Sequence, residues 1–432
     1  MNKTKLFMPV LGVSLIAGAI ASGTSQTVDA ASSATPAAVL ENYRSLAELE
    51  FSDALAQAKA LNTAIDAFLA DPTEKTLASA KTAWFASRVP YQQTEVYRFG
   101  NAYVDEWEGK VNAWPLDEGL IDYVDASYGT ESDENPYYSA NIIANPKLTI
   151  GGKEVDATTI DKKLLAETLH EIDEVESNVA TGYHVIEFLL WGQDLYGTNP
   201  GAGERPASDF STTKCTGGNC DRRRDYLKAA TDLLIDDLND IVAAWAPEGD
   251  ATKQLQAKGD QGGLSTILTG MGSLAYGELA GERIKLGLML HDPEEEHDCF
   301  SDNTHYSHFY DAVGIKNVYM GSFTDSQGKT SSGASLSALI AAMNADLDQE
   351  MKQKLDATEA AMQVMVDSAK AGSPVDVLIG EGNTKGNQII QNVVDALVSQ
   401  TKTTEKIVAA LKLEGIDVEG SDSLDNPEAV FN

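Results

Sequence analysis

Basic side chains are scarce in this sequence. The chain has 32 Lys and Arg residues against 66 Asp and Glu residues, so its formal net charge is -34. This deficit argues against nucleic acid as a partner, because phosphate groups require a basic binding face. An acidic surface concentrates cations, but it is also typical of adaptation to a salty habitat, and net charge alone favours that simpler interpretation.

Long hydrophobic runs are missing beyond the start of the chain. The apolar segment Leu6–Ile20 follows two lysines and has the length of an export signal, which is too short for a comfortable membrane span. We therefore expect residues 1–31 to be a signal peptide and the remainder to be soluble, with no transmembrane helix. An N-terminal membrane anchor is the alternative. No Cys lies near the small-residue cleavage patterns, which argues against lipid attachment.

Cysteine is rare as well, with three residues in the whole chain. Cys215 and Cys220 enclose a flexible Thr-Gly-Gly-Asn turn, so a small disulfide-closed loop is their simplest pairing in an oxidising compartment. Cys299 is then a free buried thiol, although its pairing with either of the others stays open. A zinc site would need more ligands at closer spacing than this loop provides.

Strand-like alternation is scarce, whereas helical spacing of apolar residues dominates and predicts an all-α fold. The second predicted helix should end before Pro90, because proline restricts the residue ahead of it. One small hairpin is expected at Leu148–Val155, around a Gly-Gly pair. The predicted helices are Ala37–Leu69, Thr76–Arg88, Lys162–Leu190, Arg222–Trp245, Leu264–Leu290, Leu336–Ala371 and Asn387–Leu413.

The mature chain is too long for one core, so two helical bundles are expected. Two irregular stretches, Gly192–Asp221 and Leu290–Ser335, are longer than simple connectors and indicate function or disorder. The first separates two helical halves. We therefore predict an N-terminal bundle at residues 36–221 and a C-terminal bundle at 222–432, related by a weak internal repeat.

The sharpest local motif is Gly-x-His-x-x-Glu, which contains His184 and Glu187. Residues three apart share one face of a helix, so an imidazole and a carboxylate can converge on one cation. An apolar run follows, and a carboxylate buried there is costly unless it is paired or bound to a metal. The simpler alternative is a hydrogen-bonded structural pair.

The zinc-peptidase motif His-Glu-x-x-His is absent. His170 and Glu171 begin like one, but Glu174 stands where the second His is required. A hydrolytic zinc site normally has three protein ligands and an open water position. Further ligands to a site at His184 must therefore come from elsewhere in the chain.

Their expected source is an acidic segment in which four of the six histidines lie, between His291 and His308. Histidine and carboxylate together suit iron, zinc or copper. The candidates are His297, Asp302 and His305. A solvated acidic loop with incidental histidines is the alternative.

A third group interleaves charges with aromatic residues. Arg88, Glu95 and Arg98 are followed by Trp114 and Asp117. This pattern indicates partnered, partly buried charges, which either position a ligand or hold two helices together. The structural interpretation is the more common one.

Taken together, these motifs resemble the imelysin family, in the family's order and over about residues 38 to 415. The resemblance implies an exported protein of two helical bundles with a site between them, in the periplasm or associated with the outer membrane. Some members are iron-regulated or act beside iron transporters. The family takes its name from a metallopeptidase, whose His-x-x-Glu was regarded as the metal site. The matching residues are Trp84, Arg88, Pro90, Tyr91, Glu95, Arg98, Phe99, Asn112–Asp117, Gly182–Gly192, Gly281–Arg283 and Cys299–His305.

Our leading hypothesis is a periplasmic metal-binding protein that serves iron acquisition, with an iron-transport component of the cell envelope as a possible partner. Iron is the expected metal, with zinc or copper as alternatives. There are two alternative functions. One is a metallopeptidase with Glu187 as general base, and the other is a non-metal ligand-binding module that uses the arginines. The predicted metal ligands are His184, Glu187, Glu95, Asp117, His297, Asp302 and His305. The predicted supporting residues are Arg88, Arg98, Arg283, Glu282 and Trp114.

Overall fold

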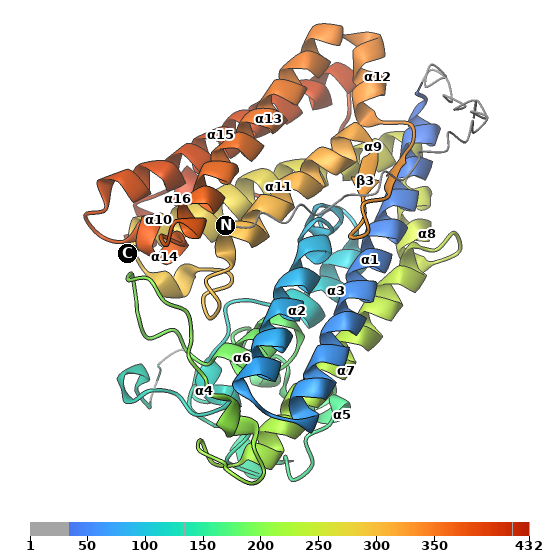
Figure 1. Cartoon of the computed structure of the whole chain (residues 1–432). Coiled ribbons are helices and arrows are strands. Elements are labelled where there is room, and N and C mark those ends of the chain that lie inside the picture. The colour runs from blue at the N-terminus through green and yellow to red at the C-terminus, as the bar shows by residue number, and fades with distance from the viewer. Residues whose placement is uncertain (1–33, 131, 133–134, 417, 432) are drawn as a thin grey trace, which may run out of the picture. The chain divides into compact units, whose positions relative to one another are not determined.

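Helices make up nearly all regular structure in the computed structural model, which describes residues 34–130, 132, 135–416 and 418–431 (Figure 1). The predicted all-α class is confirmed. The signal peptide expected at residues 1–31 lies outside the described residues. None of the described helices is both long and apolar enough to span a membrane.

The helices fall into long and short segments. The longer ones are α1 (Pro36–Ala70), α2 (Glu74–Gln92), α3 (Ala102–Asn112), α6 (Gly182–Trp191), α7 (Cys220–Trp245), α8 (Asp250–Ala257), α9 (Gly259–Ser273), α11 (Thr304–Met320), α12 (Leu336–Met343), α13 (Ala345–Lys370) and α15 (Thr384–Leu411). The shorter ones are α4 (Glu118–Ile121), α5 (Lys162–Leu164), α10 (Leu286–Leu290), α14 (Val375–Ile379) and α16 (Asp422–Asp425). A π-helical segment, η6 (Leu274–Lys285), joins α9 to α10.

The strands of the described chain form two small hairpins. β1 (Lys147–Ile150) pairs antiparallel with β2 (Lys153–Asp156), so the hairpin predicted around the Gly-Gly turn is confirmed. β3 (Ser322–Thr324) pairs in the same way with β4 (Thr330–Ser332).

An aromatic cluster fills the space among α1, α2, α3 and α7. α1 packs along both α2 and α7, and α3 also packs on α7. Phe51 meets Trp107 edge-on at 5.5 Å between ring centroids, and Tyr43 meets Trp245 edge-on at 6.0 Å. Tyr97 lies 5.7 Å from the Trp245 ring. Edge-to-face pairs contribute about 0.5–1.5 kcal/mol each beyond the area that they bury.

The later helices pack mainly on one another. α13 packs along α15, as the orange and red helices of Figure 1 show, and α15 also packs along η6. α11 contacts α13 and also α2, so it connects the later helices to the earlier ones. The division into bundles at residue 221 stays a prediction. α7, which begins there, packs on α1 and α6.

Three of the predicted helices differ from the structure. The predicted helix Leu336–Ala371 is divided at Asn344 into α12 and α13. α2 continues through Pro90 to Gln92, because the missing proline N–H lies in the last turn and removes one bond near the helix end. The single helix predicted at Lys162–Leu190 is interrupted between α5 and α6. Glu171 (φ 51°) and Asp173 (φ 65°) adopt left-handed backbone conformations, which a continuous helix does not allow.

The stretch Leu290–Ser335 is not the long loop that was predicted, because it contains α11. This helix carries His305, Tyr306, His308, Phe309 and Tyr310 in place of an apolar stripe. It buries residues on several faces, so the usual one-sided periodicity is weak.

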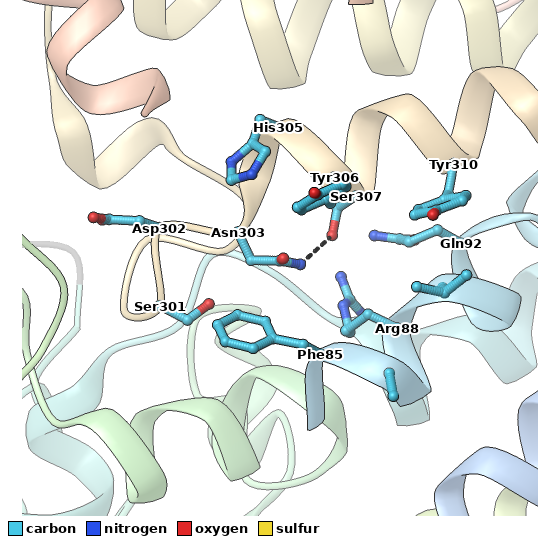
Figure 2. Close-up of a pocket in the computed structure, with 12 residues that line it drawn as sticks. Phe85, Arg88, Gln92, Ser301, Asp302, Asn303, His305, Tyr306, Ser307 and Tyr310 are labelled. Atoms are coloured by element: carbon cyan, nitrogen blue, oxygen red, sulfur yellow. Dashed lines mark hydrogen bonds between the residues drawn. The ribbon is translucent and has the colours of Figure 1, made fainter. Parts of the chain in front are cut away.

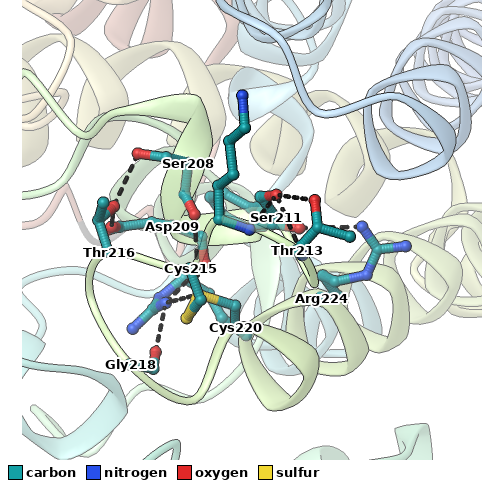
Figure 3. Close-up of a disulfide and its surroundings, with 12 residues drawn as sticks. Ser208, Asp209, Ser211, Thr213, Cys215, Thr216, Gly218, Cys220 and Arg224 are labelled. Atoms are coloured by element: carbon teal, nitrogen blue, oxygen red, sulfur yellow. Dashed lines mark hydrogen bonds between the residues drawn. A yellow bond between two sulfur atoms is a disulfide. The ribbon is translucent and has the colours of Figure 1, made fainter.

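Cys215 and Cys220 form a disulfide at the start of α7 (Figure 3). Thr216, inside the loop, donates a hydrogen bond to Asp209 at 2.7 Å. Arg223 donates to the Gly218 carbonyl at 2.9 Å. The loop is therefore held by one hydrogen bond to Asp209, in the segment before it, and by one from Arg223 of α7, as well as by the disulfide. Cys299 is free.

Candidate metal centre

The helix that carries the Gly-x-His-x-x-Glu motif is fixed at its first residue. Gly182 has φ +88°, and a Cβ there would lie 2.4 Å from the Val111 carbonyl oxygen of α3. Only glycine allows this close approach without strain. Trp84 of α2 donates its indole N–H to the Tyr183 carbonyl at 3.0 Å. Every residue of α6 is buried, so the motif lies deep between α2 and α3.

His184 and Glu187 are in contact inside the protein. Nδ1 of His184 lies 3.2 Å from Oε2 of Glu187, and the two residues are 1% and 0% exposed. Oε1 of Glu187 accepts a hydrogen bond from the Ser301 amide at 3.0 Å. Nε2 of His184 has no hydrogen-bond partner. Nδ1 of His184 also lies 3.7 Å from Oδ1 of Asp298, so this nitrogen faces two carboxylates while Nε2 faces none within hydrogen-bond distance.

Burial shifts the pKa values of both His184 and Glu187 toward their uncharged forms. It lowers the pKa of His184 to about 3, with Arg88 contributing in the same direction. Burial also raises the pKa of Glu187 well above its usual range, assisted by the nearby Asp298. At neutral pH the imidazole is therefore neutral, which is the form that binds a metal.

His297 and Asp298 come to this pair from the segment that precedes α11. The His184 and His297 rings lie 4.6 Å apart between centroids, at a steep angle. His184, His297 and Asp298 each offer one ligand atom, and these atoms all lie within 4.8 Å of one another. Asp298 is held by Asn303, which donates to its Oδ2 at 2.8 Å, and by Ser307. The structure thus brings together two segments that are separated by more than a hundred residues.

Arg88 supplies the positive charge at this place. Its Nη2 lies 2.9 Å from Oδ1 of Asp298, and its Nη1 donates to Oδ1 of Asn112 at 2.7 Å. Nη2 also lies 3.5 Å from Nδ1 of His297. Burial opposes ionisation of Asp298, but Arg88, His184 and the hydrogen bonds from Ser307 and Asn303 together outweigh it, so the pKa of Asp298 is below its usual value.

The donor set fits a transition metal. Two neutral imidazoles and one ionised carboxylate are ligands that iron, zinc and copper accept. The partnerless Nε2 of His184 is a buried polar atom, and such atoms need an explanation. Glu187 on the opposite nitrogen is the carboxylate–histidine arrangement that orients metal-binding imidazoles.

A cavity of about 500 Å³ lies beside the centre, between α2 and the start of α11 (Figure 2). It shares Arg88 and Ser301 with the centre. Asn303 and Ser307 form part of its wall and also hold Asp298. Phe85, Tyr306 and Tyr310 make the opposite parts of the wall apolar and aromatic. The centre is therefore separated from this cavity by a thin layer of polar side chains.

Glu95 and two predicted arginines form a different cluster. Nη2 of Arg283 lies 2.9 Å from Oε2 of Glu95 and 2.7 Å from Oε1 of Glu278. Arg283 also reaches Asp311 at 3.4 Å. Arg98 contacts Glu278 at 3.4 Å. Glu95 is thus paired with an arginine, which leaves it less available to a metal.

Among the other predicted residues, Trp114 packs on His297 of the centre, whereas the rest lie elsewhere. Asp117 accepts hydrogen bonds from Asn135 at 2.5 Å and Ser177 at 2.6 Å. The Trp114 ring lies 5.7 Å from that of His297. His305 lines the cavity and packs on Tyr306, while Glu282 is exposed. Asp302 belongs to another acidic group, with Asp194 and Asp376.

Sequence reasoning missed Asp298 as a candidate, although it directly follows His297. The available signal was an acidic residue at the centre of the histidine-rich segment. It was indistinguishable there from its many acidic neighbours. Arg88 was expected as a supporting charge, and the structure places it directly on Asp298.

Comparisons with known proteins agree on a fold. A family model described as imelysin matches residues 46–404. A crystal structure of an iron-regulated protein A precursor from Parabacteroides distasonis ATCC 8503 is similar, with a TM-score of 0.63 and 20% sequence identity. The match covers 87% of this chain and 95% of that one. No curated protein matches the sequence. At 20% identity the structural likeness shows the fold alone.

Proposed function

Because the chain belongs to the imelysin family, we propose that it is an exported protein that binds a metal ion and serves iron acquisition at the cell envelope. The observation that carries this proposal is the convergence of His184, His297 and Asp298, whose ligand atoms lie within 4.8 Å of one another. The name of the similar iron-regulated precursor supports iron as the metal.

His184, His297 and Asp298 would hold the ion, and Glu187 would orient His184. Both oxygens of Glu187 are already used, one by Nδ1 of His184 and one by the Ser301 amide. This favours an orienting role over direct ligation. A bound cation would also lie close to Arg88, and Asp298 is the carboxylate that both positive charges would share.

The same contacts weigh against the two alternative functions. A peptidase needs a carboxylate free to take a proton from water, and neither oxygen of Glu187 is free. An anion-binding module needs an unpaired guanidinium, and Arg88 is committed to Asp298 and Asn112. We therefore propose metal binding without proteolysis.

The test is the metal content of the mature protein, purified without chelator and without an affinity column that carries metal. We expect one transition-metal ion per chain after exposure to iron, zinc or copper, and its loss in His184→Ala and His297→Ala. Glu187→Gln should weaken binding by about 10- to 100-fold, because it alters only the orienting group.

His170→Ala is the matched control, since His170 is half-buried and contacts the Ala180 amide in a different place. It should retain the metal. Circular dichroism checks that each variant is folded. The proposal is wrong if the folded parent protein binds no metal, or if His184→Ala binds it as tightly as the parent does.

A further inference from the structure

A second group of carboxylates lies beside the cavity, on the far side of the segment that carries Asp298. Asp194 follows α6, Asp302 precedes α11, and Asp376 belongs to α14. One carboxylate oxygen from each lies within 4.8 Å of the other two. In Figure 2 the Asp302 side chain points away from Arg88, so it is directed out of the region of the His184 centre. Three segments that are distant in sequence therefore meet through acidic groups.

These carboxylates have no positive partner. None of the three forms an ion pair with Lys or Arg in the described part of the chain. Asp376 is only 2% exposed, and neither of its oxygens accepts a hydrogen bond of ordinary geometry. A buried carboxylate without a partner is costly. Asp298, by contrast, is balanced by Arg88.

A fourth carboxylate faces the same place. Glu296 is 2% exposed, and both of its oxygens are without a hydrogen-bond partner. Together with Asp194 and Asp376 it lines a cavity of about 10 Å³. A site of about 10–15 Å³ is the size needed for one water molecule or a single ion.

The pKa of Asp376 reflects the lack of a positive partner. Burial, followed by the charges of Asp302 and Asp194, raises the pKa of Asp376 to about 7, against slight opposition from nearby backbone amides. The dominant neighbouring charges are thus all negative.

We propose that Asp194, Asp302 and Asp376 bind a Ca²⁺ ion, with Glu296, which lines the small cavity beside Asp194 and Asp376, as a further oxygen donor. The donors are all carboxylate oxygens, which is the ligand chemistry of Ca²⁺. Oxygens bound to one Ca²⁺ ion at about 2.4 Å lie at most about 4.8 Å apart, and one oxygen from each of these carboxylates falls within that limit.

The ion would stabilise the segment that supports the metal centre. Asp302 lies in the same segment as Asp298 and directly follows Ser301, whose amide binds Glu187. Fixing Asp302 to Asp194 and Asp376 restrains that segment without touching His184. This Ca²⁺ site is independent of the transition metal proposed above.

The test is isothermal titration of Ca²⁺ into the mature protein after removal of metal with EGTA, in about 0.15 M KCl to screen the acidic surface. We expect one saturable site per chain. Asp376→Asn and Asp302→Asn should each lower the affinity at least tenfold. Asp240→Asn is the matched control, because Asp240 is exposed on α7 and the charge change is the same. It should titrate like the parent protein.

Thermal melting gives a second reading that separates lost binding from lost folding. Without Ca²⁺, Asp376→Asn should melt at a higher temperature than the parent protein, because it removes an unpaired buried charge. With Ca²⁺ the parent protein should gain stability and Asp376→Asn should not. His184→Ala should bind Ca²⁺ normally, and Asp376→Asn should retain the transition metal. The proposal is overturned if the folded parent protein has no saturable Ca²⁺ site, or if both carboxylate variants titrate as the parent does.

Discussion

Removing Arg88 should strongly destabilise this protein. Its guanidinium lies 2.9 Å from Asp298, and the two side chains are 2% and 0% exposed. Breaking a buried ion pair by removing one partner costs about 3–5 kcal/mol, because the other charge stays buried without compensation. Arg88→Met keeps much of the apolar stem and removes the charge. We therefore expect its free energy of unfolding to fall by about 3–5 kcal/mol.

Urea unfolding followed by circular dichroism measures this loss, and a double-mutant cycle assigns it to the pair. Arg88→Met and Asp298→Asn together should cost about 2 kcal/mol less than the sum of the single variants, because neither charge is then left alone. Arg88→Lys, which keeps the charge, should cost less than Arg88→Met.

A bound metal should compensate for the missing guanidinium. Saturating Zn²⁺ should stabilise Arg88→Met more than the parent protein, since the ion then supplies the positive charge beside Asp298. The reasoning is refuted if Arg88→Met unfolds within about 1 kcal/mol of the parent protein, or if the two substitutions are simply additive.

Two further predictions concern the backbone at α6 and a buried acid on α7. Gly182→Ala should destabilise the fold by about 3 kcal/mol or more, because its Cβ would meet the Val111 carbonyl at a positive φ. Gly109→Ala is the control, since a Cβ there meets nothing within 4 Å, and it should be neutral or slightly stabilising. Thermal melting measures both effects. Burial raises the pKa of Asp237 to about 7, so the folded protein keeps this proton to higher pH than the unfolded chain does. The free energy of unfolding should therefore fall by up to about 4 kcal/mol between about pH 4 and pH 7. Urea titrations measure this decline, and Asp237→Asn should remove it. The prediction is contradicted if Asp237→Asn shows the same pH profile as the parent protein.

Much of the fold could be predicted because helices are local. The spacing of apolar residues predicted α1, α7 and α15 to within a few residues. It failed where the tertiary structure overrides local preference, as before α6, where Glu171 and Asp173 adopt left-handed conformations and Gly182 lies against the Val111 carbonyl of α3. It also missed α11, whose buried faces carry histidine and tyrosine in place of an apolar stripe.

The sequence by itself determined the helical class, the scarcity of positive charge and the shared helix face of His184 and Glu187, because these depend on composition and on residues within one turn. Only the tertiary structure decided which distant residues meet them. It placed His297 and Asp298 at His184, paired Glu95 with Arg283, and directed Asp302 to Asp194 and Asp376. Such choices depend on packing between segments that are far apart in the sequence, which local preference does not encode. Burial makes an unpaired charge costly, and this favours the pairing of Glu95 with Arg283 and of Asp298 with Arg88.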